Sequence, residues 1–379
     1  MLRGPSRVTL RQKGECVLTI RLAVLLLLTL SADAAENKFV NEQYDLQKIA
    51  DGVYSFIAPE SDSGVVQSNC TVIIGDEAVL VVDTGQFPSL AERMVADIQK
   101  LTSKPVRYIV NTHWHFDHVW GNAVFRDAYP GVAILSTEFT RELIEEQGPK
   151  VLSTQRKVNK EQAAQMRKYV VAGKLPDGRV VTEEIKRRLN RLADTLDYID
   201  ADLVHTIHAP PTIGFDKELT INLGKREVKV LWLGRANTGG DAVTWIPDAK
   251  VLLTGDTVVA PTPFAFGSYL SEWPVTLQKM IDMNATTIIP GHGPVMHDAS
   301  YLKILAEMFQ ALTAQVKQAV AQGLSLEDTR KKVTLDDFSQ RLAAGNSDRL
   351  RAFRSAFLHP AVDRAYQEAT GQMKPEAED

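Results

Sequence analysis

The segment from residue 113 to residue 118 concentrates four side chains that can bind a metal ion. His113, His115, Asp117 and His118 directly follow an apolar run typical of a buried strand. Because alternate residues of an extended chain point to the same side, His113 and His115 can bind one ion, and a following turn would direct Asp117 and His118 to a second position. Explaining them as core residues would require several buried polar groups to find partners in one short loop. The spacing therefore indicates a metal centre.

Four further segments carry motifs that belong with this one. They are Val81-Val82-Asp83-Thr84-Gly85 before it and, after it, Leu233 to Asp241 with Asn237, Thr254-Gly255-Asp256, and Pro290-Gly291-His292-Gly293. In this order, and with the H-x-H-x-D-H signature, the sequence resembles the metallo-β-lactamase superfamily. The resemblance covers roughly residues 50 to 298.

The resemblance implies an α/β fold of the αββα sandwich type with one or two zinc ions per chain. The ligands that it implies are His113, His115, Asp117, His118, Asp256 and His292. Asp256 would bridge the two ions, and His292 would complete the second site. Asp83 would support the site without binding metal.

One position departs from the family pattern. Where the family usually has a third histidine for the first metal, in a pattern like G-x-x-H-T, this sequence has Asn237. An amide oxygen suits hard cations better than zinc, so zinc affinity at the His113 and His115 site should be lower and Asn237 is a weak or absent ligand. Three arrangements stay open: two metals with Asn237 or water completing the first site, one metal in the second site, or replacement by His205 or His208.

The implied reaction is metal-assisted hydrolysis of a small-molecule substrate. The metal lowers the pKa of bound water to about 7 and polarises the substrate carbonyl. Asp117 would bind metal and orient the attacking hydroxide, which makes it the candidate catalytic residue. Tyr269 and Trp114 are candidate substrate-binding residues, whereas Phe116 and Trp120 are better explained as core.

Short strands and one helix would position these residues. Strands are predicted at residues 53–58, 71–74, 78–82, 106–110, 218–223, 227–233, 242–246, 251–254 and 286–289. Ser89 opens a capping box, and apolar residues then recur at helical spacing until Lys104-Pro105. The strand, helix, strand order favours a layered α/β fold.

Two regions are predicted to be mainly helical. Residues of about 137–199 would form an insertion over one rim of the site, with Ile185, Leu189, Leu192 and Leu196 on one apolar stripe. After Asp298, a long helix ending at Gly323 and two or three shorter helices reaching about Thr370 are expected. The predicted division is a metallo-β-lactamase-like domain at 45–298 and a C-terminal helical extension at 299–379.

Residues 1–35 have the pattern of a signal peptide. Five basic residues precede the apolar run 22–30, and small residues follow it. Because a membrane span needs about 20 apolar residues, we expect cleavage near Ala34 or Ala35 and no stable membrane insertion afterwards. The protein would then be exported, to the periplasm or beyond the cell. An uncleaved signal anchor is the alternative.

The composition is that of a globular protein, with 44% hydrophobic and 24% charged residues. Residues 1–35 hold five of the 43 basic and two of the 47 acidic residues, so 38 basic and 45 acidic residues remain, for a net charge of −7. Nothing in this balance suggests nucleic-acid binding. Cys70 is the only cysteine after the signal, which excludes an intramolecular disulfide and favours a core position. The oligomeric state stays open.

Several functions are compatible with these residues. The leading one is hydrolysis of an amide-like or ester-like bond, with β-lactams the first class to test because export would place the enzyme where such antibiotics act. Asp256 favours instead a lactonase or thioesterase resembling the glyoxalase II branch. An iron or zinc oxidoreductase and a non-catalytic metal-binding protein are further alternatives, the last of them suggested by Asn237.

Overall fold

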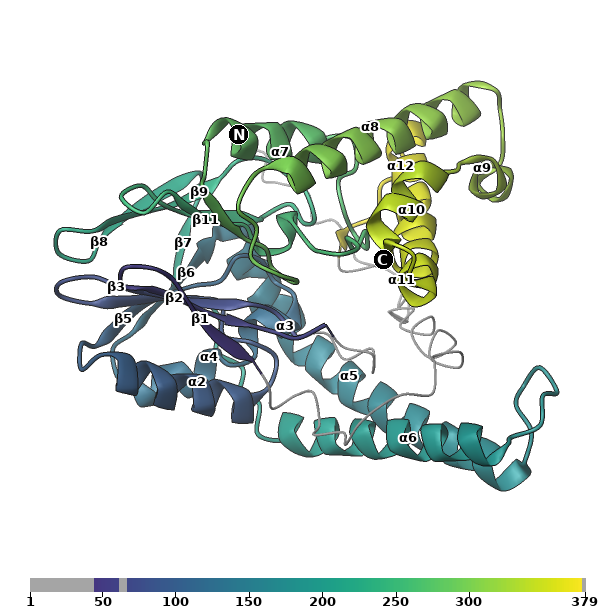
Figure 1. Cartoon of the computed structure of the whole chain (residues 1–379), viewed down its shortest axis with the longest axis horizontal. Coiled ribbons are helices and arrows are strands. Elements are labelled where there is room, and N and C mark those ends of the chain that lie inside the picture. The colour runs from purple at the N-terminus through teal and green to yellow at the C-terminus, as the bar shows by residue number, and fades with distance from the viewer. Residues whose placement is uncertain (1–43, 61–66, 377–379) are drawn as a thin grey trace, which may run out of the picture.

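Two β-sheets face each other in the computed structural model, which describes residues 44–60 and 67–376 (Figure 1). The first sheet keeps its strands in chain order: β1 Asp45–Ala50, β2 Val53–Ile57, β3 Cys70–Ile74, β4 Val79–Val82, β5 Val106–Val110, β6 Ala133–Thr137 and β7 Ile213–Phe215. The second sheet has the order β12-β11-β10-β9-β8, with β8 Glu218–Asn222, β9 Glu227–Trp232, β10 Ala242–Ile246, β11 Val251–Leu253 and β12 Thr287–Ile289. The expected signal peptide at 1–35 lies outside the described residues.

Every predicted strand is present to within two residues at either end, but three strands were missed. One is β6, whose apolar run Ala133-Ile134-Leu135 is only three residues long. The other two are β1 and β7. The first, β1, has no fully buried residue, so its sequence lacks the apolar alternation of a half-buried strand. The second, β7, has only three residues, which is too short for a periodic signal. Both are edge strands of the first sheet.

The apolar side chains of β4 show how the layers are built. Leu80 and Val82 pack between the two sheets, while Val79 and Val81 pack against the helices α2 Pro88–Leu101 and α4 Asn122–Ala128. Both faces of this strand are buried, which explains its continuous apolar run. Helices α7 Trp273–Asp282 and α8 Ser300–Ala321 cover the second sheet, so the predicted αββα order is confirmed.

The start of α2 differs from the prediction. Pro88 occupies the first turn after the N-cap residue Phe87, and Ser89 lies inside the helix. The Ser89 hydroxyl donates to Oδ2 of Asp202 at 2.9 Å, and its amide donates to Oδ1 at 3.3 Å. The predicted capping box was therefore wrong, because a carboxylate more than one hundred residues away satisfies the first turn.

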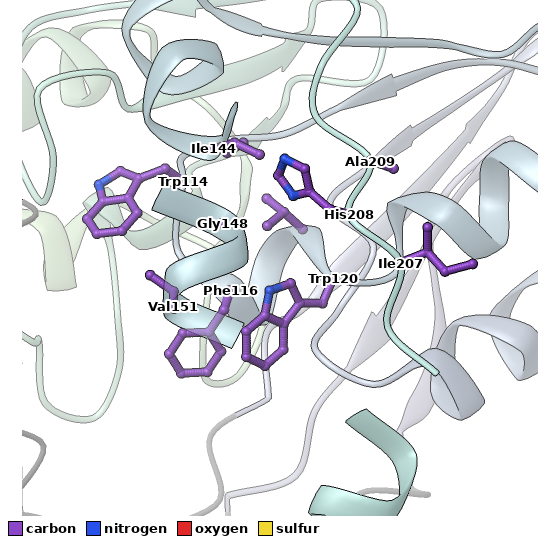
Figure 2. A pocket seen from close by; sticks show the side chains of 10 residues that line it. Trp114, Phe116, Trp120, Ile144, Gly148, Val151, Ile207, His208 and Ala209 are labelled. Atoms are coloured by element: carbon purple, nitrogen blue, oxygen red, sulfur yellow. The ribbon is translucent and has the colours of Figure 1, made fainter. Parts of the chain in front are cut away.

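The predicted insertion forms the two long helices α5 Glu138–Ala172 and α6 Glu183–Leu203, which pack side by side (Figure 1). Leu189 of α6 is buried in a small cluster with Ala163 and Met166 of α5. At its other end, α5 lines a small apolar pocket together with the metal-binding segment, formed by Trp114, Phe116, Trp120, Ile144, Gly148, Val151 and neighbouring residues (Figure 2). The insertion therefore borders the segment that holds the candidate ligands.

The chain after Asp298 contains more helices than the two or three expected after α8. These are α9 Leu326–Lys332, α10 Asp336–Ala343, α11 Ser347–Ala352 and α12 His359–Thr370, with a π-helical turn at Phe353–Leu358. Phe309 of α8 stands 4.5 Å from the ring of Trp273 and 5.6 Å from that of Phe357, measured between ring centroids. These helices therefore share one apolar core with the second sheet. None of the helices in the described part of the chain combines the length and apolarity of a membrane span.

Candidate metal centre

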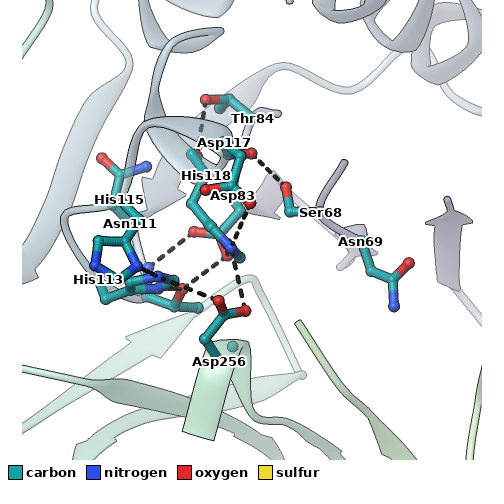
Figure 3. Close-up of polar contacts among 12 residues, drawn as sticks. Ser68, Asn69, Asp83, Thr84, Asn111, His113, His115, Asp117, His118 and Asp256 are labelled. Atoms are coloured by element: carbon teal, nitrogen blue, oxygen red, sulfur yellow. Dashed lines mark hydrogen bonds and ion pairs between the residues drawn. The ribbon is translucent and has the colours of Figure 1, made fainter. Parts of the chain in front are cut away.

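The predicted ligands lie where strands of the two sheets end. His113 and His115 follow β5, and the short helix α3 Phe116–Val119 carries Asp117 and His118 (Figure 3). Asp256 stands in a 3₁₀ turn after β11, and His292 follows β12. Because β11 and β12 are parallel neighbours, their carboxyl ends bring the last two residues to one edge of the second sheet. Six residues from three separate segments of the chain thus meet at one place.

Four of these side chains surround what we call the second position. His118 Nε2 lies 3.5 Å from Asp117 Oδ2 and 3.2 Å from Asp256 Oδ1. His292 Nε2 lies 3.1 Å and 3.3 Å from the same two oxygens. Ligands bonded to a tetrahedral zinc ion at its usual bond lengths stand about 3.3 Å apart. The four atoms are therefore spaced as the ligands of one such ion.

Three atoms of this group are buried and make no hydrogen bond within the described chain: His118 Nε2, Asp256 Oδ1 and His292 Nε2. Buried polar atoms are almost always satisfied, so an unpartnered cluster of nitrogen and oxygen atoms calls for a missing partner. Imidazole and carboxylate together suit zinc and related divalent ions. The residues present therefore fit a bound metal.

The first position is built around His113. Its Nε2 lies 3.0 Å from Nδ1 of His115 and 3.6 Å from Oδ2 of Asp256. Asp256 thus turns one oxygen toward each position, with Oδ1 toward the second and Oδ2 toward the first. This is the arrangement that a bridging carboxylate would need.

Asn237 follows β9 and is buried, with 2% of its surface exposed and its amide nitrogen unpartnered in the described structure. It supplies no imidazole to the first position. The two replacement histidines considered above, His205 and His208, are exposed, and neither belongs to the metal-binding groups found among the described residues. Instead, His208 lines the apolar pocket of Figure 2.

Asp83 orients the ligands through hydrogen bonds to Thr112 and His118. It accepts hydrogen bonds from the Thr112 amide and hydroxyl, both at 2.8 Å, and faces Nδ1 of His118 at 2.7 Å (Figure 3). The His118 proton therefore sits on Nδ1, which leaves the Nε2 lone pair for metal. Because the Thr112 hydroxyl donates to Asp83, it accepts from Nδ1 of His113 at 3.0 Å, which leaves the Nε2 lone pair of His113 facing His115 and Asp256.

Sequence reasoning missed several supporting residues. The Gln67 carbonyl accepts from Nδ1 of His292 at 2.7 Å, and the Ser68 hydroxyl donates to the Asp117 carbonyl at 2.5 Å. The Asn69 amide group donates to the carbonyls of Pro290 and Gly293 at 2.9 Å. Residues 67–69 carry no motif of their own, and only their closeness to the ligands in the folded chain identifies them.

The imidazoles of the centre fall into two kinds by the direction in which their pKa values are shifted. Burial lowers the pKa of His113 and of His115, so both are neutral and ready to bind. Burial acts in the same direction on His292, but Asp256 and Asp117 outweigh it and raise the pKa of His292 to about 10. The same two carboxylates and Asp83 raise the pKa of His118. A metal at the second position would replace these protons as the partner of the carboxylates.

The two candidate substrate-binding residues lie on one side of the centre. The Trp114 ring stands 4.8 Å from that of His115, and its Nε1 donates to Glu376 at 3.0 Å. Tyr269 is half-buried and also hydrogen-bonds Glu376, while the Arg235 guanidinium lies 4.3 Å from its ring centroid. Trp120 is buried as expected, whereas Phe116 is only partly buried and stacks on it.

Comparison with known proteins settles the family. Residues 63–292 match the model of the metallo-beta-lactamase superfamily, which spans all the candidate ligands. The chain belongs to this superfamily. Members of this superfamily include metal-dependent hydrolases. The fold and the metal-binding side chains described above are both consistent with this membership.

Individual metallo-beta-lactamase relatives are distant. The chain is 24% identical to a beta-lactamase-like protein 2 homolog of Caenorhabditis elegans (66% of this chain, 64% of the relative) and 23% identical to a linear primary-alkylsulfatase of a Pseudomonas species (78% and 54%). It therefore spans less than two thirds of the length of either. A metallo-beta-lactamase type 2 of Bacteroides fragilis is 19% identical over 73% of this chain and 89% of its own.

A solved structure shows the same fold. The metallo-beta-lactamase from Pontibacter korlensis superposes with a TM-score of 0.50 at 21% identity, over 71% of this chain and 99% of its own.

Proposed function

We propose that the protein is an exported zinc-dependent hydrolase that cleaves an amide-like or ester-like bond in a small molecule. The observation that carries the proposal is the placement of the Asp256 oxygens, one toward each of two groups of imidazoles. His113 and His115 would hold the first ion, and Asp117, His118 and His292 the second. A metal centre of this kind provides Lewis acidity and makes water nucleophilic at neutral pH.

The protein's own residues would orient the reacting groups. Asp117 is held through its backbone carbonyl by Ser68, and its Oδ2 faces both His118 and His292. From this place it would accept a hydrogen bond from the attacking water and direct it toward the substrate. Asp83 keeps His118 in the metal-binding tautomer, which makes it a positioning residue.

β-Lactams are the first substrate class to examine, because the relatives include metallo-beta-lactamases and because residues 1–35 predict export. A lactone or thioester is the second candidate, and the bridging placement of Asp256 favours it. A sulfate ester belongs in the same panel, since one relative is named an alkylsulfatase.

The test combines metal content with turnover. The purified protein without residues 1–35 is analysed by elemental mass spectrometry and assayed with a chromogenic cephalosporin, a lactone, a thioester and an alkyl sulfate. We expect one or two zinc ions per chain and turnover of at least one substrate. His292→Ala should lose the second-position ion and all turnover, while His297→Ala, an exposed histidine, should lose neither. Full zinc and turnover in His292→Ala would contradict the assignment.

A further inference from the structure

A single buried carboxylate ends an otherwise exposed segment next to the metal centre. After α12 ends at Thr370, residues 371–375 are exposed, whereas Glu376 has 7% of its surface exposed. Hydrogen bonds to α12 hold this segment: Arg364 donates to the Lys374 carbonyl at 3.0 Å, and the amides of Gly371, Gln372 and Lys374 donate to Glu368 and Gln367 at 2.8 to 3.3 Å. Because residues 371–375 are exposed, apolar packing of these neighbours does not explain why Glu376 is inside.

Donors from three separate parts of the chain meet this carboxylate. The Gly239 amide donates to Oε1 at 2.5 Å, and the Trp114 indole donates to Oε2 at 3.0 Å. The Tyr269 hydroxyl forms a further hydrogen bond to the same side chain. A backbone N–H and an indole N–H can only donate, so this group of donors suits an acceptor with two oxygens, such as a carboxylate.

These donors adjoin the metal centre, because the Trp114 ring stands 4.8 Å from that of His115. Trp114 stands between His113 and His115, and Gly239 is two residues beyond Asn237. A side-chain carbon at residue 239 would lie 2.9 Å from the Phe139 ring and 3.0 Å from Oε1 of Glu376, so a larger residue would crowd both the ring and the carboxylate. Two guanidinium groups also flank Tyr269, with Arg235 at 4.3 Å and Arg364 at 5.9 Å from the ring centroid.

We propose that Trp114, Gly239 and Tyr269 form a carboxylate-binding subsite, and that Glu376 is its internal occupant, which withdraws when a carboxylate of the substrate binds. The substrate class rests on the hydrolase function proposed above: the scissile bond would lie at the metal centre and a free carboxylate in this subsite. Burial raises the pKa of Glu376, so keeping the ionised side chain inside costs free energy. This cost suits an occupant that can be displaced.

Binding can be measured without any turnover. The zinc-loaded full chain and its Glu376→Ala variant are titrated with acetate, and the Trp114 indole resonance is followed by ¹⁵N NMR, assigned by its loss in Trp114→Phe. Because an internal occupant lowers the fraction of open subsites, acetate should act at about tenfold lower concentration on Glu376→Ala. Acetamide, which has the same shape without the charge, should not shift the resonance.

The controls separate the subsite from other effects. Glu307→Ala removes a carboxylate from an exposed part of α8 and should respond as the unaltered chain does. Acetate that binds only at the metal would act on all three chains at the same concentration, which would overturn the proposal. If Glu376→Ala does not fold, Glu376→Gln keeps the side-chain size and should also respond to less acetate; an unchanged response would again overturn it.

A kinetic comparison tests the substrate class. Two esters that differ only in a free carboxylate are compared, and Glu376→Ala should lower KM for the charged ester by about tenfold while leaving KM for the neutral ester unchanged. An equal change for both esters would contradict substrate recognition by this subsite. Absence of turnover with either ester counts against the proposed hydrolase function, and the acetate titration then still decides whether the subsite exists.

Discussion

Asn237 stands where the superfamily pattern has a histidine, and we expect this single exchange to make the two metal positions unequal. The second position has four donor atoms at separations of 3.1 to 3.5 Å. The first has two imidazoles and one oxygen of Asp256. We therefore expect the second position to bind zinc more tightly.

Replacing Asn237 with histidine should restore a third nitrogen ligand to the first position. Zinc affinity there should rise by about tenfold or more, because imidazole is a better zinc ligand than a neutral amide oxygen. Zinc titration against a competing chelator measures it, with Gln310→His on an exposed part of α8 as control. Unchanged stoichiometry and affinity would show that Asn237 does not limit this position.

Asp83 affects the metal through His118. In Asp83→Asn, the amide cannot accept all of the hydrogen bonds that the carboxylate takes from Thr112 and His118. Zinc affinity at the second position should fall by roughly 10- to 100-fold, the usual cost of losing such a partner. The same chelator competition measures it, and Asp127→Asn, an exposed aspartate, should have no effect. Equal zinc affinity in both variants would rule out this positioning role.

At the scale of elements, the centre depends on how helices are attached to the first sheet. The turn between β5 and α3 changes the direction of the chain, so that His113 and His115 face one position and Asp117 and His118 the other. The insertion is tied to the same sheet through α2, because Asp202 of α6 accepts two hydrogen bonds from Ser89. This contact fixes one end of the insertion.

Removing this carboxylate should weaken the attachment of α6. Asp202→Ala leaves the Ser89 amide and hydroxyl without their partner, and the free energy of unfolding should fall by about 1–2 kcal/mol. Asp194, also on α6, forms an exposed ion pair with Arg167 of α5, and Asp194→Ala should cost at most about 0.5 kcal/mol. Urea unfolding followed by circular dichroism compares the two, and equal losses would remove the special role of Asp202.

At the scale of the whole molecule, the helices after Asp298 complete the layer over the second sheet. The rings of Trp273, Phe309 and Phe357 pack at tilted angles, linking α7 through α8 to the π-helical turn. These rings belong to the same buried cluster as Leu252 and Ile288 of the second sheet. The candidate ligands Asp256 and His292 follow strands of that sheet, so its packing bears on the metal centre.

A chain ending at residue 298 should therefore lose its native structure. Without α8, the apolar side chains of α7 would be exposed, and we expect aggregation or loss of cooperative unfolding together with loss of bound zinc. A chain ending at residue 371, which keeps α8 to α12, should retain both. Thermal unfolding and zinc analysis of the two chains decide this. A shorter chain that unfolds cooperatively and keeps its zinc would support a separate domain at 45–298.

Much of this protein follows from local sequence. The apolar periodicity of α2, α6 and α8 and the apolar runs of the central strands predict the layers, because each pattern depends on neighbours a few residues away. The candidate ligands at 113–118 are evident for the same reason, since four metal-binding side chains stand within six residues. The edge strands β1 and β7 and the short strand β6 were missed because none of them carries such a pattern over enough residues.

The remaining features of the site depend on contacts between distant residues. Only the tertiary structure gives the two oxygens of Asp256 different partners and pairs Nδ1 of His292 with the Gln67 carbonyl. It brings Glu376 to Trp114, 262 positions away in the chain. It also gives Ser89 a carboxylate from α6 in place of its own capping box. The physical reason is that hydrogen bonds and metal ligation act over about 3 Å in space, whatever the separation in sequence. Local periodicity determines the elements, whereas the packing of elements determines which polar atoms meet.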